Sequence, residues 1–205
     1  MDPFTRIAEL ESLLKDAHQE VEKLRHDCIT GLIGRQTFEE LLQATFVPRR
    51  ADDGLIGIIM CDIDHFKDVN DEHGHRIGDE VIGIVAQAIK ACVRSTDHVA
   101  RYGGEEYVSI VARSSNAGLA HLSERIRAAV EMKEHPGCPK VTISVGFSLQ
   151  LEDDENAWDV VERADQALYI AKNTGRNRVG HETLGPQELH LIEKIEKLRR
   201  KKTHE

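Results

Sequence analysis

Acidic side chains directly follow one apolar segment of this chain, in a position typical of a metal site. Residues 55–61 are short enough to form a strand that is buried on both faces, and Asp62-Ile63-Asp64 come next. A carboxylate at the mouth of an apolar sheet is unfavourable unless it meets a cation. Magnesium binds a few carboxylates together with substrate phosphates, so Asp62 is predicted to be a metal ligand. Asp64 is interpreted instead as the N-cap of the helix that follows.

A second acidic pair occupies a predicted hairpin. Arg101-Tyr102-Gly103-Gly104-Glu105-Glu106-Tyr107 places two glycines between short strands, which allows a tight turn and close approach of the backbone to a ligand. A Gly-Gly-Glu-Glu segment is weak evidence when it stands alone. If its strand lies beside the strand that leads to Asp62, however, Asp62 and Glu105 can share a metal ion.

Three basic residues could complete a phosphate site. Lys67 follows the first carboxylates closely, and Lys172 and Arg176 lie near the end of the last predicted core helix. The two later residues are four apart, so they are expected on one helical face. Facing one pocket, the three would neutralise a triphosphate as phosphoryl transfer requires. Taken alone, Lys172 and Arg176 are equally explained as cations that match the dipole at a helix C-terminus.

Other metal and polyanion chemistry fits the sequence poorly. An EF-hand fails because Phe66 and Lys67 stand where that loop needs a ligand and a glycine. His65, His73 and His75 are close together, but they lie among the expected phosphate-binding elements, which disfavours zinc. The net charge of −9 excludes a general nucleic-acid sheath, so any bound phosphate must meet local cations or a metal.

The elements that position these residues alternate along the chain. The order strand, helix, hairpin, helix, strand predicts an α/β (α+β) sandwich, with a mostly antiparallel sheet and helices on its faces. The apolar patterns and turn signals predict helices over 35–45, from 66, over 77–93, 117–132 and 158–173, and strands over 55–61, 98–102, 107–112 and 141–149.

A heptad pattern precedes this core. Apolar residues spaced three and four apart predict a helix over 5–28 that pairs with a second copy of itself, although a helix lying on its own domain is the alternative. The seam consists of Ile7, Leu10, Leu14, Ala17, Val21, Leu24 and Cys28. We therefore expect a coiled-coil helix over 1–28, a catalytic domain over 29–180 and a charged, helical tail over 181–205. The tail's basic run 199–202 is interpreted as a solvated end, with an anionic partner as the alternative.

The expected location is the cytoplasm. No apolar run reaches the roughly 18 residues of a membrane span, and no apolar segment resembles a signal peptide. The four cysteines are far apart and form no Cys-x-x-Cys pair, which favours reduced thiols. An N-terminal sensor domain is expected to be missing from this chain, with 1–28 as the linker that receives its signal.

About three quarters of the chain resembles the GGDEF family of diguanylate cyclases, with Gly103–Tyr107 as a GGEEY variant of the signature. The matching blocks, in family order, are Asp27–Leu32, Asp62–Asp71, Gly74–Asp79, Arg101–Tyr107, Ile143–Gly146, Ala164–Tyr169, Lys172 and Gly175–Asn177. The resemblance implies a palm-like nucleotidyl-cyclase fold. It also implies an enzyme that condenses two GTP into cyclic di-GMP and two pyrophosphates across a homodimer.

The resemblance assigns roles by position. Asp62, Glu105 and Glu106 would be catalytic and would bind Mg²⁺ or Mn²⁺ with the Ile63 carbonyl. Glu106 would be a further ligand or would help to deprotonate the ribose 3′-hydroxyl. The implied substrate-binding set is Phe66, Lys67, Asn70, Asp79, Lys172 and Arg176. Asn70 and Asp79 would read the guanine edge, because an ionised carboxylate accepts from guanine N1–H and the 2-amino group whereas adenine has no matching donors. The three cations would hold the phosphates.

Arg94 and Asp97 match the family's RxxD site, where product cyclic di-GMP binds and inhibits; no motif assigns Arg125 to it. The departures are Gly34, where the family has Asn, and Tyr107, where it has Phe and whose hydroxyl needs a partner or solvent. The alternatives are a degenerate GGDEF receptor for GTP or cyclic di-GMP, a cyclase that also accepts ATP, and a dimerisation adaptor. Intact Asp62, Glu105, Glu106 and Asp79 argue against these.

Overall fold

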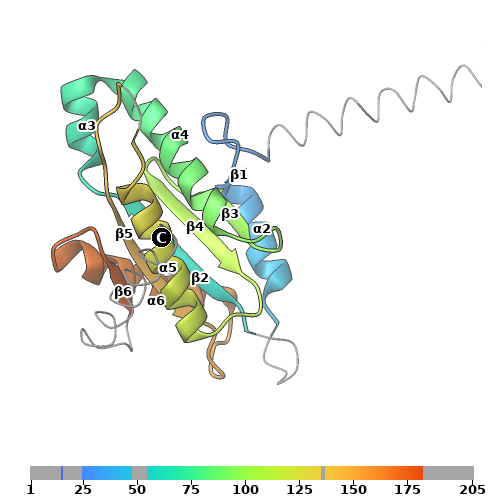
Figure 1. The fold of residues 1–205 in the computed structure, drawn as a ribbon. Coiled ribbons are helices and arrows are strands. Elements are labelled where there is room, and N and C mark those ends of the chain that lie inside the picture. Colours follow the sequence, from blue (N-terminus) through green and yellow to red (C-terminus); the bar gives the residue numbers. More distant parts are fainter. Residues whose placement is uncertain (1–14, 16–24, 48–54, 135–136, 182–205) are drawn as a thin grey trace, which may run out of the picture.

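A six-stranded mixed sheet forms the centre of the computed structural model, which describes residues 15, 25–47, 55–134 and 137–181 (Figure 1). The strands lie in the order β1-β3-β4-β2-β5-β6. Their bounds are β1 Ile33–Gly34, β2 Gly57–Ile63, β3 His98–Arg101, β4 Glu106–Val111, β5 Ile143–Leu149 and β6 Val179–His181. Each of the four inner strands is antiparallel to its inner neighbours, and the short outer strands β1 and β6 pair in parallel with β3 and β5. The mostly antiparallel α/β sheet predicted from the sequence is confirmed.

Helices cover both faces of this sheet. Their bounds are α2 Arg35–Thr45, α3 Phe66–His73, α4 His75–Cys92, α5 Asn116–Glu131 and α6 Ala157–Asn173. Helices α3, α4 and α5 share one apolar cluster, and α2 and α6 share the other. Strand β2 serves both, since Ile59 and Cys61 join the first cluster whereas Ile58 and Met60 join the second. Every residue of β2 is buried, so the expectation of a strand covered on both faces is confirmed.

Close packing of α6 on the sheet depends on a glycine in β5. A Cβ atom at Gly146 would lie 2.3 Å from the Ala164 carbonyl oxygen and 2.1 Å from the Leu168 nitrogen, both of which belong to the α6 backbone. Backbone atoms cannot move aside as a side chain can, so any larger residue would push the helix away from the sheet. Gly146 therefore determines how closely α6 approaches the sheet, and with it the distance of Lys172 from the end of β2.

Two expectations about local structure are wrong. The helix expected to run through Cys28 has ended by Arg25: His26 forms a bridge with Ile33, and the Arg25 carbonyl accepts a hydrogen bond from the Gly34 amide at 2.8 Å. The segment from Arg25 is thus part of the sheet edge. Lys15 is helical, but the predicted seam residues from Ile7 to Leu24 lie outside the described residues, as does the tail from 182.

The N-cap predicted at Asp64 is also wrong. The residue before α3 is His65, which has a left-handed backbone and no side-chain cap, and the Asp64 carboxylate bonds elsewhere in the sheet. Tyr107, in contrast, finds the partner that its hydroxyl is predicted to need, because it donates to the Ile82 carbonyl of α4 at 2.8 Å. No helix in the described part of the chain is both long and apolar enough to cross a membrane.

Candidate active site at the end of the central hairpin

Three carboxylates meet where β2 ends and β4 begins. Asp62 stands directly opposite Glu106 in the antiparallel register, and the Ile63 amide donates to the Glu105 carbonyl at 3.3 Å. The arrangement follows from the sheet order, since the glutamates lie at the turn from β3 into β4 and β2 is the next strand. The structure thus brings Asp62, Ile63, Glu105 and Glu106 together, and their roles as ligands remain predictions.

Lys172 joins this acidic group from the last turn of α6. Its Nζ lies 2.8 Å from Asp62 Oδ2, and the Asp62 side chain is only 9% exposed. Burial raises the pKa of Asp62 above its usual value, and the Lys172 ammonium opposes that rise. Burial also raises the pKa of Glu105, and repulsion from Asp62 adds to it. A bound cation would oppose both shifts, since positive charge favours the ionised carboxylates.

The carboxylates of this site suit a metal ion whose remaining ligands come from water or substrate. Among the described residues, no group of three or more His, Cys, Asp or Glu side chains is arranged to hold a metal ion unaided. Magnesium commonly uses one or two carboxylates together with substrate phosphates and water. Asp62 and Glu105, close in space and both with raised pKa values, fit this incomplete kind of site.

The predicted base-reading residues lie at the junction of α3 and α4. Asn70 is half-buried on α3, and Asp79 is exposed on α4. A Cβ atom at Gly78 would lie 2.0 Å from Asn70 Oδ1, so the absence of a side chain there lets the Asn70 amide lie against α4, next to Asp79. Phe66 is 6% exposed and belongs to the apolar cluster under α4, which explains its position without a ligand.

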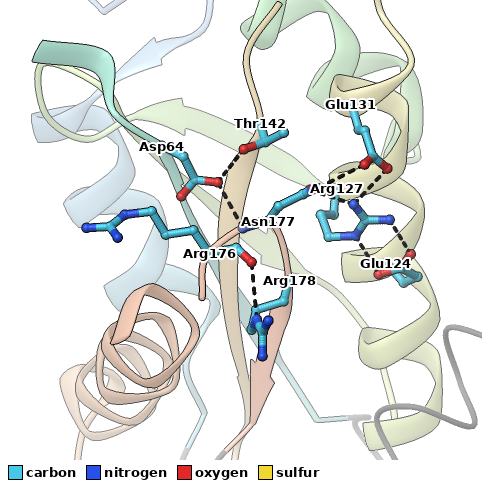
Figure 2. Close-up of polar contacts among 8 residues, drawn as sticks. All are labelled: Asp64, Glu124, Arg127, Glu131, Thr142, Arg176, Asn177 and Arg178. Atoms are coloured by element: carbon cyan, nitrogen blue, oxygen red, sulfur yellow. Dashed lines mark hydrogen bonds and ion pairs between the residues drawn. The ribbon is translucent and has the colours of Figure 1, made fainter. Parts of the chain in front are cut away.

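The basic residues come from separate elements. Lys67 is exposed in the first turn of α3. The expectation that Lys172 and Arg176 share a helical face is wrong, because α6 ends at Asn173 and Arg176 has a left-handed backbone with φ of 56°. Arg176 instead lies in the loop that returns towards Asp64, to which the next residue, Asn177, bonds through its amide (Figure 2).

Arg101 and Asp27 occur in the sequence motifs only as parts of longer blocks. In the structure they form an ion pair beside the acidic hairpin. Arg101 Nε and Nη2 donate to the Gly104 carbonyl at 3.2 and 2.7 Å, while Nη1 donates to Asp27 Oδ2 at 3.0 Å. Burial would raise the pKa of Asp27, but hydrogen bonds from Thr30 and the charge of Arg101 lower it. This ion pair joins the segment before β1 to the tip of the acidic hairpin.

A separate cleft of about 290 Å³ contains the predicted RxxD residues. Arg94 is exposed there, and Asp97 is buried with its carboxylate accepting from the Arg94 amide at 2.9 Å and the Ala112 amide at 3.3 Å. Asp97 therefore shapes the turn that presents Arg94. Arg125 of α5 also lines the cleft, with its guanidinium bonded to the Cys92 carbonyl. No sequence motif points to Arg125; its place on α5, facing the turn, is visible only in three dimensions.

The fold and these residues define an α/β domain with an acidic centre at the end of its central hairpin. Residues 24–178 match the family model described as "Diguanylate cyclase, GGDEF domain". Diguanylate cyclase A of Treponema denticola is 40% identical over 179 residues, which cover 84% of this chain and 48% of that protein. The chain belongs to the GGDEF family, and it spans half or less of the length of the first curated relatives it matches.

Solved structures show the same architecture. The coiled coil and GGDEF domain of DgcB from Caulobacter crescentus, in complex with c-di-GMP, superposes with a TM-score of 0.80 at 33% identity and covers 86% of this chain and 95% of that one. The active GGEEF domain of a diguanylate cyclase from Vibrio cholerae has a TM-score of 0.70 at 29% identity, over 75% of this chain and 99% of that one. The GGDEF fold is therefore established for this chain.

Proposed function

We propose that this protein is a diguanylate cyclase with a GGEEY form of the family signature, which condenses two GTP into cyclic di-GMP and two pyrophosphates. The observation that carries the proposal is the pairing of Asp62 and Glu106 across β2 and β4, with Glu105 and Lys172 beside them. All four cysteines are free thiols, which supports a reducing compartment such as the cytoplasm, where GTP is available.

Asp62, Glu105 and the Ile63 carbonyl would hold Mg²⁺ or Mn²⁺, with Glu106 as a further ligand. When bound, the cation would lower the pKa of the attacking 3′-hydroxyl and stabilise charge on the α-phosphate and the leaving pyrophosphate. Glu106, which is half-buried in the same group, would accept the hydroxyl proton. Lys172, now paired with Asp62, would turn its ammonium to the phosphates, where Lys67 and Arg176 add charge.

Guanine would bind at the α3–α4 junction. The exposed Asp79 carboxylate can accept from N1–H and the 2-amino group, and Asn70 can donate and accept beside it. One domain offers one such set, so each domain would hold one GTP. Two domains would then have to face each other for each 3′-hydroxyl to attack the other nucleotide's α-phosphate.

Product inhibition would take place at the cleft of Arg94, Asp97 and Arg125. Three arginines, Arg94, Arg113 and Arg125, line this cleft, and guanidinium groups suit a ligand with two phosphates and two guanine edges. The DgcB structure, which is described as a complex with c-di-GMP, supports a product-binding role for this fold. Cyclic di-GMP bound at this cleft would lower the maximal rate without competing with GTP.

The direct test is to incubate the protein with Mg²⁺ and GTP, ATP or both and to identify the products by mass. Cyclic di-GMP is expected from GTP alone, and none from an Asp62→Ala variant. Asp159→Ala is the matched control, because it removes the capping box at the opposite end of α6 and destabilises the helix by about 1 kcal/mol without touching the site. Binding of GTP without conversion would favour the receptor alternative, and a mixed dinucleotide would show relaxed base choice.

A further inference from the structure

The backbone of Arg176 is held in a conformation that arginine rarely adopts. Arg176 and Asn177 are both left-handed, with φ of 56° and 45°. Asparagine tolerates this region because its short amide can bond locally, whereas arginine is disfavoured there. Such a conformation persists only where neighbouring groups fix it, and it is found mainly at functional sites. The surroundings of these two residues therefore need an explanation.

Asp64 fixes the backbone of this loop. Its Oδ2 accepts from the Asn177 amide at 3.0 Å and from Thr142 Oγ1 at 2.6 Å (Figure 2). Its Oδ1 accepts from Ser144 Oγ at 2.6 Å. The residue is 5% exposed, and both of its oxygens are occupied. A buried carboxylate with three donors is rigid, so the Asn177 amide has a fixed anchor only two residues along the chain from Asp62.

The Asn177 side chain is bound independently by α5. Its Oδ1 accepts from Arg127 Nη1 at 2.6 Å, and its Nδ2 donates to Glu131 Oε1 at 2.9 Å (Figure 2). A guanidinium can only donate and a carboxylate can only accept, so an amide is the group that satisfies both partners. Arg127 is itself buried and bonded to both oxygens of Glu124 at 2.9 and 2.7 Å, which keeps it in place.

The next residue closes the loop. Arg178 Nε donates to the Arg176 carbonyl at 3.1 Å, and the Arg178 carbonyl accepts from the Val145 amide of β5 at 2.9 Å. The Arg176 side chain is exposed, and its guanidinium makes no hydrogen bond or ion pair with any residue in the described part of the chain. Figure 2 shows it extending away from Arg127 and α5. The backbone around Arg176 is therefore anchored on both sides while its charged group is available to a ligand.

We propose that Asn177 is a positioning residue, which locks the left-handed loop against Asp64 and α5 so that Arg176 presents its guanidinium to the substrate triphosphate. This inference rests on the proposed function. Without the lock, the loop would relax out of the disfavoured region and the guanidinium would lose its position. The competing explanation is that the network only fastens α5 to the loop, in which case it stabilises the fold and any effect on GTP is independent of Arg176.

A double-mutant cycle separates these explanations. The probe is 3′-deoxy-GTP with Mg²⁺, which lacks the attacking hydroxyl, and its affinity is measured by calorimetry alongside KM and kcat for GTP. Asn177→Ala and Arg176→Ala should each weaken binding and raise KM by about tenfold, or about 1.4 kcal/mol. Because Asn177 acts through Arg176, the affinity of the double variant for 3′-deoxy-GTP should fall by about tenfold and not by about a hundredfold. The proposal would be overturned if the double variant lost affinity by the product of the two single losses, or if the Asn177→Ala protein bound with wild-type affinity.

Two further variants keep the test decisive. Glu131→Ala removes the acceptor of Asn177 Nδ2 from a half-exposed position, together with the ion pair between Glu131 and Arg127, and leaves Asn177 itself in place. It therefore decides the question if Asn177→Ala does not fold. We expect a loss of affinity of about threefold that vanishes in an Arg176→Ala background. Asp154→Asn is the control: it breaks a comparable ion pair with Arg163, at 2.5 and 2.7 Å, and should lower Tm with unchanged KM. If the wild type binds 3′-deoxy-GTP but forms no product from GTP, the proposed function fails while the binding cycle still tests Asn177.

Discussion

At the scale of single residues, the site contains carboxyl groups whose ionised forms are disfavoured by burial and by mutual repulsion. Burial raises the pKa of both Asp62 and Glu105. A carboxyl group whose pKa is raised on folding binds its proton more tightly in the folded state, so stability is lost as pH rises through that folded pKa. The free energy of unfolding without metal should therefore decline as pH rises above the usual range of a carboxylate.

The first prediction is that Glu105→Gln stabilises the metal-free domain while it abolishes activity. The substitution removes a half-buried charge that repels Asp62, so the free energy of unfolding should rise by about 1 kcal/mol or less. Mg²⁺ together with 3′-deoxy-GTP should raise the Tm of the wild type by linkage, but not that of the variant. Thermal scans with and without both ligands measure this. An equal ligand-induced shift in the two proteins would remove Glu105 from the metal site.

A second prediction concerns Gly78. Alanine there would place its Cβ atom 2.0 Å from Asn70 Oδ1, which is far too close, and should displace the amide that we propose to read guanine. We expect kcat/KM for GTP to fall by about tenfold or more, a change in barrier of roughly 1.4 kcal/mol.

The matched control lies on the same helix. A Cβ atom at Gly83 would meet only the Ile29 carbonyl oxygen at 3.9 Å, an ordinary contact, so Gly83→Ala should stabilise α4 slightly and leave kcat/KM unchanged. A comparable fall in kcat/KM in both variants would show that helix packing in general, and not the Asn70 contact, limits activity.

At the scale of elements, one ion pair links two segments that are far apart in sequence. Arg101 holds both the Asp27 carboxylate and the Gly104 carbonyl, so the segment that leaves the N-terminal region contacts the acidic hairpin directly. A shift of the segment around Asp27 would thus alter the turn that carries Glu105. Through this contact, a movement of the segment around Asp27 can change the position of the acidic hairpin.

The third prediction follows from the lowered pKa of Asp27. A carboxyl group whose pKa is lowered on folding adds stability above its unfolded pKa, near 3.8, and this contribution disappears as pH falls through the lower folded value. Urea midpoints between pH 6 and 3 should therefore fall less steeply for Asp27→Asn than for the wild type. Activity of the variant at pH 7 should also fall, because the hairpin loses one restraint.

The control for this experiment is Asp153→Asn, which changes an exposed carboxylate in a loop far along the chain from the hairpin. Its midpoints should follow those of the wild type over the whole pH range. If Asp27→Asn did the same, the ion pair with Arg101 would contribute nothing to stability.

The long elements can be predicted from the sequence because their signals are local. Strand β2 is a continuous apolar run, and α4 and α6 have clear helical periodicity, so the pattern predicts each within a few residues of its observed bounds. Strands β1 and β6 have two and three residues, too few to show any period, and they form only by parallel pairing with distant strands.

The candidate site, like the fold, can be predicted only where its signals are local in the sequence. Asp62 and the hairpin glutamates are predicted together because neighbouring antiparallel strands bring their ends to one edge. The partners of Asp64 cannot be anticipated, since Thr142 and Asn177 lie 78 and 113 residues away. Helical spacing misplaces Arg176 because it extends the helix past the end of α6, whereas the loop turns left-handed there.

At the scale of the whole molecule, the proposed product requires two active sites to meet. The described part of one domain has one set of the residues proposed to read the base and to bind the metal, and cyclic di-GMP contains two guanylyl units. Two domains must therefore face each other, and holding them together makes the encounter effectively intramolecular. The heptad pattern of residues 7–24 is the device that we propose for pairing two copies.

The last prediction is that activity depends on this pairing. Deletion of residues 1–24 leaves Arg25, whose carbonyl bonds to the Gly34 amide, so the catalytic fold should remain intact. The deleted protein, or one with Leu14→Glu and Leu24→Glu, should be largely monomeric at micromolar concentration because the apolar seam is lost. Its activity per molecule should be low and should rise steeply with protein concentration, since the tether that raised the effective concentration of the second site is gone. Gln19→Glu, on the outer side of the same heptads, should remain dimeric with wild-type activity. Sedimentation that finds a monomer with full, concentration-independent specific activity would falsify the requirement for a dimer, because a single domain would then have supplied both nucleotides.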